Sequence, residues 1–305
     1  MPIPEVEKIW MDGELVDWKD AKIHLLSHSL HYGSGVFEGI RAYETPRGAA
    51  VFRLTDHMRR LFRSAAIYRK PIPFSLEELV EATKVVIRAN GLKSCYIRPI
   101  AFRGYGEMGL HPMAAPVNVA IAVWPWGAYL GEEGIKNGVR AKVSSFRRND
   151  ANTIPTAAKA TGQYLNSILA KMEAVEAGYD EAILLNLHGH VADGAGENIF
   201  VVRNGVVFTP PTSAGALEGI TRDSVMRIAE DMDIPCREKD LVRTDLYIAD
   251  EAFFTGTAAE VVPIREIDDR EIGDPGPITR RIQDKFFEVV EGKDKAYEHW
   301  LEYVD

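Results

Sequence analysis

Lys159 has the local surroundings that best suit covalent chemistry. It lies within residues 152–164 (NTIPTAAKATGQY), where the only other ionisable side chain is Tyr164. A lysine with small neutral neighbours can be desolvated, and desolvation favours the free amine that Schiff-base chemistry requires. A helix-terminal lysine that extends its ammonium group into solvent is the simpler alternative. This segment alone therefore leaves both interpretations open.

Two further segments combine accessible backbone with reactive side chains. Residues 193–198 (DGAGEN) predict a glycine-rich turn in which Asp193 or Glu197 can face a protonated ring nitrogen. In residues 217–223 (LEGITRD), Thr221 opens an expected helix, and the free N–H groups of a helix start can bind phosphate. An ordinary acidic loop and simple N-capping by Thr221 are the respective alternatives.

A turn of small residues, 255–259 (TGTAA), is the fourth feature, and its backbone amides can bind a carboxylate. Each of the four features is compatible with ordinary structure when taken singly. Together they provide a reactive lysine, an acid for a pyridine nitrogen, a phosphate site and a carboxylate site. These are the requirements of pyridoxal phosphate chemistry.

The paired histidines do not indicate a metal site. His28 and His31, and separately His188 and His190, have spacings that metal ligands can show, but no third ligand lies nearby in the sequence. A metal site requires several convergent ligands. We therefore expect turn or packing roles for these histidines, and no bound metal.

Short strands and helices are expected to position the features in the first part of the chain. Residues 9–11 and 15–18, joined by Asp12-Gly13, predict a β-hairpin. Residues 56–68 have helical spacing with Thr55 as N-cap, and a second helix follows the capping box at 75–78 and ends at Asn90-Gly91. We expect strands over residues 95–102 and 117–124.

A stretch rich in proline, glycine and aromatic residues, 125–136, predicts an ordered connection between domains. Beyond it we expect helices at 162–177, 221–231 and 278–290, and strands at 139–146, 183–187 and near Phe253 and Val261. Residues 199–203 and 206–209 predict a hairpin through Asn204-Gly205. The sequence thus indicates an α+β protein with domains at 1–124 and 137–305 and an inter-domain loop at 125–136, with Lys159 in the second domain. The pattern does not match a Rossmann or barrel fold.

Composition excludes several classes of partner and compartment. The 305 residues contain 36 Lys and Arg against 45 Asp and Glu, and the resulting net charge of −9 disfavours nucleic acid as a partner. Cys95 and Cys236 lack a CxxC spacing, which argues against a disulfide scaffold or a cysteine zinc site. Prolines interrupt the uncharged window 110–130, so we expect no membrane span. Without a secretory signal pattern, the cytoplasm is the expected location.

Five segments, in this order, resemble the branched-chain amino acid aminotransferases of fold type IV. They are residues 24–43 (HLLSHSLHYGSGVFEGIRAY), the Lys159 segment, VADGAGENIF, LEGITRDS and FTGTAAEVVP, and the similarity spans nearly the whole chain. The resemblance implies a smaller N-terminal domain, a larger C-terminal β-rich domain and pyridoxal 5'-phosphate in the cleft between them. It also implies a homodimer or hexamer. The implied reaction is reversible, ping-pong transfer of the amino group between L-leucine, L-isoleucine or L-valine and 2-oxoglutarate.

The resemblance assigns cofactor roles to particular residues. Lys159 would be the Schiff-base lysine and proton shuttle, and Tyr164 would hydrogen-bond the phenolic oxygen of the cofactor. Arg60 would bind the phosphate with Ile220 and Thr221, whereas its neighbour Arg59 is better explained as part of a solvated helix face. The other implied cofactor residues are Asp193, Glu197, Asn198, Leu217, Gly219, Gly256 and Thr257.

The resemblance also implies a substrate pocket that accepts both aliphatic side chains and glutamate. Arg98 shares a strand face with Tyr96 and would meet the side-chain carboxylate of glutamate at the edge of apolar walls. Met108, Gly109 and Leu110 resemble a loop that reaches the neighbouring subunit's site. The implied substrate-binding residues are Tyr32, Phe37, Gly39, Tyr96, Arg98, Met108, Leu110, Tyr129, Thr257 and Ala258.

Asp193 departs from the family pattern, which usually has glutamate at this position to pair with the pyridine nitrogen. We expect Asp193 to supply the negative charge, with Glu197 as the alternative. Related fold type IV enzymes, which act on D-amino acids, (R)-amines or aminodeoxychorismate, would share Lys159, although the Tyr96-x-Arg98 pair favours the branched-chain enzymes. A non-catalytic phosphate-binding protein is a further alternative, disfavoured by the presence of Lys159 and Tyr164.

Overall fold

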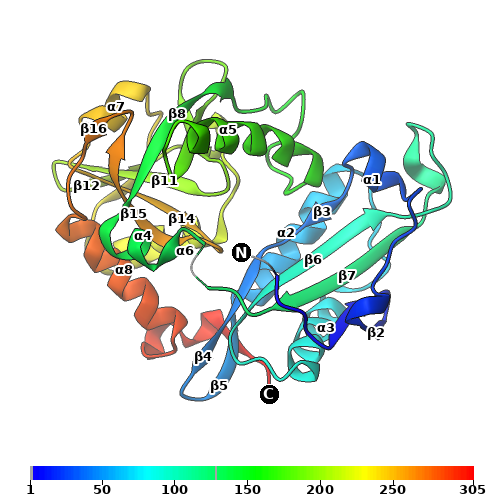
Figure 1. Cartoon of the computed structure of the whole chain (residues 1–305). Helices are drawn as coiled ribbons and strands as arrows, with labels where there is room; N and C mark the ends of the chain where they lie inside the picture. Colours follow the sequence, from blue (N-terminus) through cyan, green and yellow to red (C-terminus); the bar gives the residue numbers. More distant parts are fainter. Residues whose placement is uncertain (1–2, 128) are drawn as a thin grey trace. The chain divides into compact units, whose positions relative to one another are not determined.

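The computed structural model describes residues 3–127 and 129–305, which divide into two units (Figure 1). Unit 1 comprises residues 3–126, Ala158–Gly162 and Val289–Asp305, and unit 2 comprises residue 127, residues 129–157 and Gln163–Glu288. Both units combine helices with a β-sheet, so the expected α+β class is confirmed. Met1, Pro2 and Ala128, the last within the expected inter-domain connection, lie outside the described residues.

The first crossing between the units, after Trp126, lies within the connection expected at 125–136, but two later segments return to unit 1. Ala158–Gly162 belongs to unit 1 because Ala160 forms a β-bridge with Val36 and because Ala158 and Ala160 are buried in the core of that unit. The C-terminal segment returns to unit 1 as well, since β17 (Leu301–Tyr303) pairs with β5 (Gly48–Phe52). Lys159 therefore lies in unit 1 and not in the second domain, where the sequence analysis placed it.

Unit 1 is built on one antiparallel sheet with the strand order β17-β5-β4-β6-β7-β1-β2, to which β3 adds by pairing with β6. Its helices are α1 (His28–Tyr32), α2 (Leu54–Ile67) and α3 (Leu76–Ala89). Short 3-10 turns occupy Trp18–Asp20, Pro112–Ala114 and Lys295–Trp300. The remaining strands are β1 (Lys8–Met11), β2 (Glu14–Asp17), β3 (Val36–Phe37), β4 (Ile40–Thr45), β6 (Cys95–Arg103) and β7 (Val117–Trp124).

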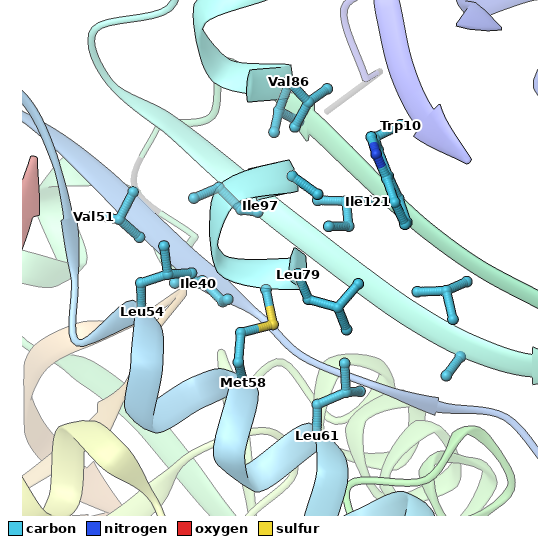
Figure 2. Close-up of a cluster of buried hydrophobic side chains, with 14 of the residues drawn as sticks. Trp10, Ile40, Val51, Leu54, Met58, Leu61, Leu79, Val86, Ile97 and Ile121 are labelled. Carbon is cyan, nitrogen blue, oxygen red and sulfur yellow. The ribbon is translucent and has the colours of Figure 1, made fainter. Parts of the chain in front are cut away.

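The core of unit 1 lies between the sheet and helices α2 and α3 (Figure 2). In α2 the buried residues Leu54, Met58 and Leu61 recur at spacings of four and three, so they share one helix face. Figure 2 shows Met58 and Leu61 beside Leu79 of α3, and Leu54 near Ile40 of the sheet. Burial of each such side chain contributes about 1.5–3 kcal/mol.

The predicted start of α3 is confirmed, whereas that of α2 is wrong. The capping box of α3 is confirmed, since Glu78 N donates to Ser75 Oγ at 3.1 Å and Ser75 N donates to Glu78 Oε2 at 2.6 Å. The N-cap expected at Thr55 is wrong, because α2 already begins at Leu54. Thr55 instead donates from its amide and its hydroxyl to Glu302, at 2.7 and 2.9 Å. A carboxylate distant in sequence thus satisfies donors at this helix start.

Unit 2 is built on a mixed sheet with the order β10-β9-β8-β15-β14-β11-β12-β13, to which β16 adds by pairing with β15. Its helices are α4 (Gly131–Asn137), α5 (Tyr164–Glu176), α6 (Ile220–Asp231), α7 (Arg243–Tyr247) and most of α8 (Pro277–Val290), and a 3-10 turn occupies Thr212–Ala214. Another 3-10 turn, Thr161–Gln163, begins in unit 1 and ends at the first residue of this part of unit 2. The strands are β8 (Val139–Arg147), β9 (Glu181–Leu185), β10 (Val191–Gly194), β11 (Asn198–Arg203), β12 (Val206–Thr209), β13 (Cys236–Glu238), β14 (Glu251–Gly256), β15 (Glu260–Ile267) and β16 (Arg270–Glu271).

Unit 2 contains one predicted hairpin and one helix that was not predicted. The β11–β12 hairpin is confirmed, and both turn residues have positive φ, 51° at Asn204 and 76° at Gly205. Helix α4, by contrast, lies where only a connection was expected. No helix among the described residues is long and apolar enough to cross a bilayer.

The core packing of α2 predicts a large stability difference between two positions on the same helix. Leu61 is fully buried, whereas Ile67 is 43% exposed. We expect Leu61→Ala to lower the free energy of unfolding by about 2–5 kcal/mol, because it leaves a cavity. Ile67→Ala, the matched control, should change it by less than about 1 kcal/mol. Urea unfolding followed by circular dichroism measures both, and equal losses would contradict the assigned core.

Candidate active site

Lys159 is positioned by the backbone and by the two alanines that flank it. Lys159 N donates to Ser64 Oγ at 3.0 Å, and Lys159 O accepts from Phe37 N at 3.0 Å. Ala158 and Ala160 are buried in the unit 1 core. Because consecutive side chains of a strand-like segment alternate in direction, Lys159 extends away from that core. Its Nζ lies 5.1 Å from the centre of the Phe37 ring.

A buried ionic network lies in the same unit. Arg60 donates from Nε and Nη2 to the two carboxylate oxygens of Glu38, each at 2.7 Å, and His57 Nδ1 lies 2.8 Å from Glu38 Oε2. Burial by itself would raise the pKa of Glu38, but Arg60 outweighs it and holds that pKa at about 2. Burial also lowers the pKa of His57. The predicted phosphate ligand Arg60 is therefore oriented by a bidentate pair with an ionised carboxylate.

The sequence analysis missed Glu38 and His57. Their signal was weak, because Glu38 is a single acid between Phe37 and Gly39. His57 and Arg60 do lie three residues apart on α2, and that spacing places them on one helix face. Only the folded chain, in which the segment between β3 and β4 brings Glu38 to this face, reveals the network.

Four of the predicted substrate residues come together around Arg98. Its guanidinium carbon lies 4.9 Å from the centre of the Phe37 ring and 5.2 Å from that of Tyr96, and its Nη2 donates to the Tyr96 hydroxyl at 3.2 Å. A Cβ on Gly39 would lie 2.0 Å from the same hydroxyl, so this close approach requires glycine. Arg98 Nε is buried with no hydrogen-bond partner among the described residues. The group thus combines aromatic walls with a donor that can bind an anion.

The other predicted substrate residues have different contacts. The Tyr32 hydroxyl donates to Met108 O at 3.1 Å, and His28 Nε2 lies 3.0 Å from Gly109 O, so α1 holds the 108–110 loop while Leu110 is 84% exposed. His28 has the packing role expected for it. Tyr129 belongs to unit 2, where Lys171 Nζ lies 5.5 Å from its ring centre.

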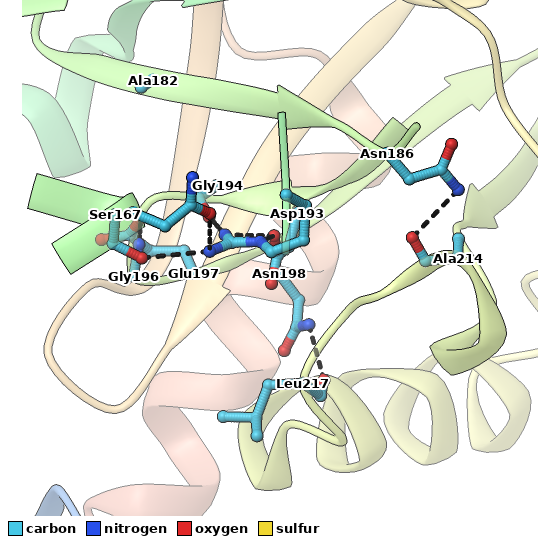
Figure 3. A network of polar contacts seen from close by, with 12 residues as sticks. Ser167, Ala182, Asn186, Asp193, Gly194, Gly196, Glu197, Asn198, Ala214 and Leu217 are labelled. Carbon is cyan, nitrogen blue, oxygen red and sulfur yellow. Dashed lines mark hydrogen bonds and ion pairs between the residues drawn. The ribbon is translucent and has the colours of Figure 1, made fainter. Parts of the chain in front are cut away.

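A pocket in unit 2 brings together the predicted residues Tyr164, Asp193, Glu197, Asn198 and Leu217. Figure 3 shows the last four of these residues. Asn198 Nδ2 donates to Leu217 O at 2.9 Å, which ties β11 to the segment before α6. The sequence analysis did not identify several further lining residues, among them Arg148, Thr156, Gln163, Ser167 and Gly215.

The two carboxyl groups of this pocket have different electrostatic surroundings. Asp193 Oδ1 accepts from Arg148 Nε at 2.8 Å and from Arg148 Nη2. Glu197 Oε2 accepts from Gly196 N at 3.0 Å, and Glu197 forms no ion pair with any described residue. Burial, together with the nearby charge of Glu181, raises the pKa of Glu197 to about 8. Near neutral pH, Glu197 is therefore mainly protonated.

The predicted phosphate and carboxylate segments each approach a residue of this pocket in space. Gly219 is the N-cap of α6 and Ile220 its first residue, so Thr221 is inside the helix and is not the N-cap. A Cβ on Gly219 would lie 1.9 Å from Asn198 Oδ1. Gly256 ends β14, and a Cβ there would lie 3.5 Å from Glu197 Cγ. Thr257 and Ala258 follow in the turn before β15.

Comparisons with known proteins agree on one family. The model of the family described as amino-transferase class IV matches residues 35–267. A branched-chain-amino-acid aminotransferase of Pseudomonas aeruginosa is 51% identical over 298 residues, which cover 97% of each chain. The crystal structure of the Escherichia coli branched-chain amino acid aminotransferase superposes with a TM-score of 0.97 at 49% identity, covering 99% of this chain and 100% of that one.

A further similar structure was solved in its cofactor-bound form. It is the branched-chain amino acid aminotransferase of Thermobaculum terrenum in the pyridoxal phosphate form, which has a TM-score of 0.93 and 38% identity and covers 99% of both chains. The fold type IV architecture implied by the sequence motifs is thus confirmed.

The raised pKa of Glu197 predicts a pH dependence of stability. Because the pKa rises from 4.5 to about 8, the folded chain binds this proton more tightly than the unfolded chain. Its stabilising contribution is complete below pH 4.5 and is lost as pH rises through 8. Glu197→Gln should therefore gain stability relative to wild type across this window, by up to about 1.4 kcal/mol for each pH unit.

Urea unfolding midpoints of the two proteins at several pH values provide the measurement. Glu176→Gln, which alters an exposed acid on α5, is the matched control and should parallel the wild type. A difference between Glu197→Gln and wild type that does not change with pH would contradict the assignment.

Proposed function

The chain belongs to the branched-chain-amino-acid aminotransferases of the class IV family, and we propose that it transfers an amino group reversibly between L-leucine, L-isoleucine or L-valine and 2-oxoglutarate. The single observation that carries this proposal is the grouping of Lys159, Phe37, Tyr96 and Arg98 in unit 1. This group combines a lysine nucleophile, two aromatic rings and a guanidinium cation.

The donor set fits pyridoxal 5'-phosphate as the cofactor. When bound, this group supplies an electron sink for the electrons of the substrate Cα–H bond. Lys159 would hold it covalently, and the Tyr164 hydroxyl would bind its phenolic oxygen. Arg60, the N–H groups at the start of α6, Thr221 and Thr257 would bind its phosphate. Glycine at 219, which a Cβ would drive into Asn198, keeps that helix start accessible.

Lys159 carries the proton in the proposed reaction. As a general base, its Nζ would accept the proton from the substrate Cα. As a general acid, it would then deliver that proton to the C4′ carbon of the cofactor. Small buried neighbours on both sides fix the backbone of Lys159, so its side chain is the part that moves. This anchoring supports the assignment of a positioned proton shuttle.

Arg98 would allow one pocket to accept two kinds of substrate. The side chain of leucine or valine requires only the apolar walls of Phe37 and Tyr96. The side-chain carboxylate of glutamate requires a cation, and the buried Arg98 Nε has no hydrogen-bond partner among the described residues. Tyr96 and the turn of residues 256–258 would bind the α-carboxylate that both substrates share.

We further propose a homo-oligomer, dimer or hexamer, located in the cytoplasm. Support for association comes from the apolar exposed face of α5 and from Leu110, which is 84% exposed. Residues that contribute to the α5 face are Leu165, Ile168, Leu169, Met172 and Val175. Cys95 and Cys236 are both free thiols, as suits a reducing compartment.

Replacement of Lys159 tests the proposed catalytic role. The purified wild type should be yellow with bound pyridoxal phosphate and should bleach with borohydride. Lys159→Ala should lose transamination of leucine by roughly 100- to 10,000-fold or more, because no group remains to move the proton. Lys136→Ala, which changes an exposed lysine on α4, should match wild type. Full activity in Lys159→Ala would refute the role.

Replacement of Arg98 tests the substrate class. In half-reactions without an acceptor, Arg98→Met should slow conversion of the bound cofactor by L-glutamate ~30-fold or more, because one partner of the charge pair is lost. Conversion by L-leucine should change much less, since methionine retains the apolar bulk. Equal losses for both amino acids would contradict the role of Arg98. A faster wild-type reaction with D-alanine or (R)-phenylethylamine than with leucine would overturn the proposed substrate class.

A further inference from the structure

Arg148, directly after β8, lines the unit 2 pocket and has no role in the proposed function. Besides Asp193, its Nη2 donates to Gly194 O at 2.6 Å, and its Nη1 donates to Ser167 Oγ at 3.1 Å. The backbone is also held, since Arg148 N donates to Leu185 O at 2.9 Å. Contacts from β10 and α5 thus orient the guanidinium, and β9 holds the backbone. Figure 3 shows Asp193, Gly194 and Ser167 of this network.

Two backbone features, a register shift in β10 and a glycine at position 215, allow Arg148 and Asp193 to meet. The β10–β9 pairing shifts register between Val191 and Asp193, and such a bulge redirects the side chain that follows it. A Cβ on Gly215 would lie 3.2 Å from Arg148 Cγ, so a larger residue at this position would press on the arginine. The bulge presents Asp193 to Arg148 although aspartate is one methylene shorter than glutamate.

Glu197 lines the same pocket as Asp193 but has no arginine partner among the described residues. It is buried beside the ion pair of Glu181 and Lys171, where Lys171 Nζ donates to Glu181 Oε2 at 2.6 Å. The cation nearest in this cluster therefore already has a carboxylate partner. Since Glu197 has no ion pair of its own among the described residues, its neutral form is favoured. One pocket thus contains one ion-paired carboxylate and one carboxyl group that retains its proton.

We propose that Arg148 is a positioning residue that keeps Asp193 ionised and oriented in the pocket, so that Asp193, and not Glu197, supplies the negative charge for the pyridine nitrogen of pyridoxal phosphate. The inference rests on the proposed cofactor. The side chain of Asp193 is one methylene shorter than the glutamate that the family usually has at this position. The β-bulge and the Arg148 guanidinium together would make up for this shorter reach by holding Asp193 in place. Arg148 acts only through Asp193 and touches no reacting atom.

The test is titration of the cofactor-free chain with pyridoxal phosphate, followed by its visible absorbance, without any amino acid present. Asp193→Asn and Arg148→Gln should each weaken binding ~10-fold or more, since a charge-assisted contact to the ring nitrogen is lost. Glu197→Gln should stay within about 3-fold of wild type, because that carboxyl group is already neutral.

A double-mutant cycle separates positioning from general stabilisation. If Arg148 acts through Asp193, the double variant Arg148→Gln/Asp193→Asn should bind no more weakly than Asp193→Asn alone. Arg148→Lys, which retains the positive charge, should recover part of the lost affinity. Arg140→Gln is the matched control, because Arg140 forms an ion pair with Glu266 at the other end of β8 and should bind as wild type does.

Three results would overturn the inference: wild-type binding by Arg148→Gln, additive losses in the double variant, or a loss in Glu197→Gln equal to that in Asp193→Asn. Urea unfolding of each variant identifies a protein that has not folded. If Arg148→Gln fails to fold, Arg148→Lys and the comparison of Asp193→Asn with Glu197→Gln decide the question. A wild type that binds pyridoxal phosphate but does not react with leucine would overturn the proposed substrates and leave this inference intact.

Discussion

The burial of Ala158 and Ala160 is the interaction on which the candidate site depends. These two side chains fill positions in the core of unit 1, and the residue between them must extend the opposite way. A larger side chain at either position would strain the close packing between Val36 and α2. The reactive lysine is thus fixed by apolar packing, while its amine remains beside Phe37.

Ion pairs with arginine are a second organising feature, and two of the buried acids have one. Glu38 pairs with Arg60 in unit 1, and Asp193 pairs with Arg148 in unit 2. A carboxylate without such a partner would be costly to bury, and Glu197 accordingly favours its protonated form. Two carboxyl groups of one short glycine-rich segment thereby have different surroundings, since, among the described residues, only Asp193 of the two pairs with an arginine.

Short-range patterns predicted most of the helices and strands. The capping box at Ser75 and the Asn204-Gly205 hairpin are confirmed, because their hydrogen bonds join residues only a few positions apart. The N-cap expected at Thr55 is wrong, since Glu302, near the far end of the chain, satisfies that helix start. The boundary near residue 125 likewise missed the return of Ala158–Gly162 and the C-terminus to unit 1.

The sequence by itself determined the family, the reactive lysine and the kinds of side chain that a pyridoxal phosphate enzyme requires, because the motifs are local and their order is specific. Tertiary structure decided which unit holds Lys159 and which partners orient Arg60 and Asp193. It also decided which of two neighbouring acids pairs with an arginine. These properties depend on burial and on contacts between residues 19 to 95 positions apart, such as Glu38 with His57 and Ser64 with Lys159, and no local pattern encodes them.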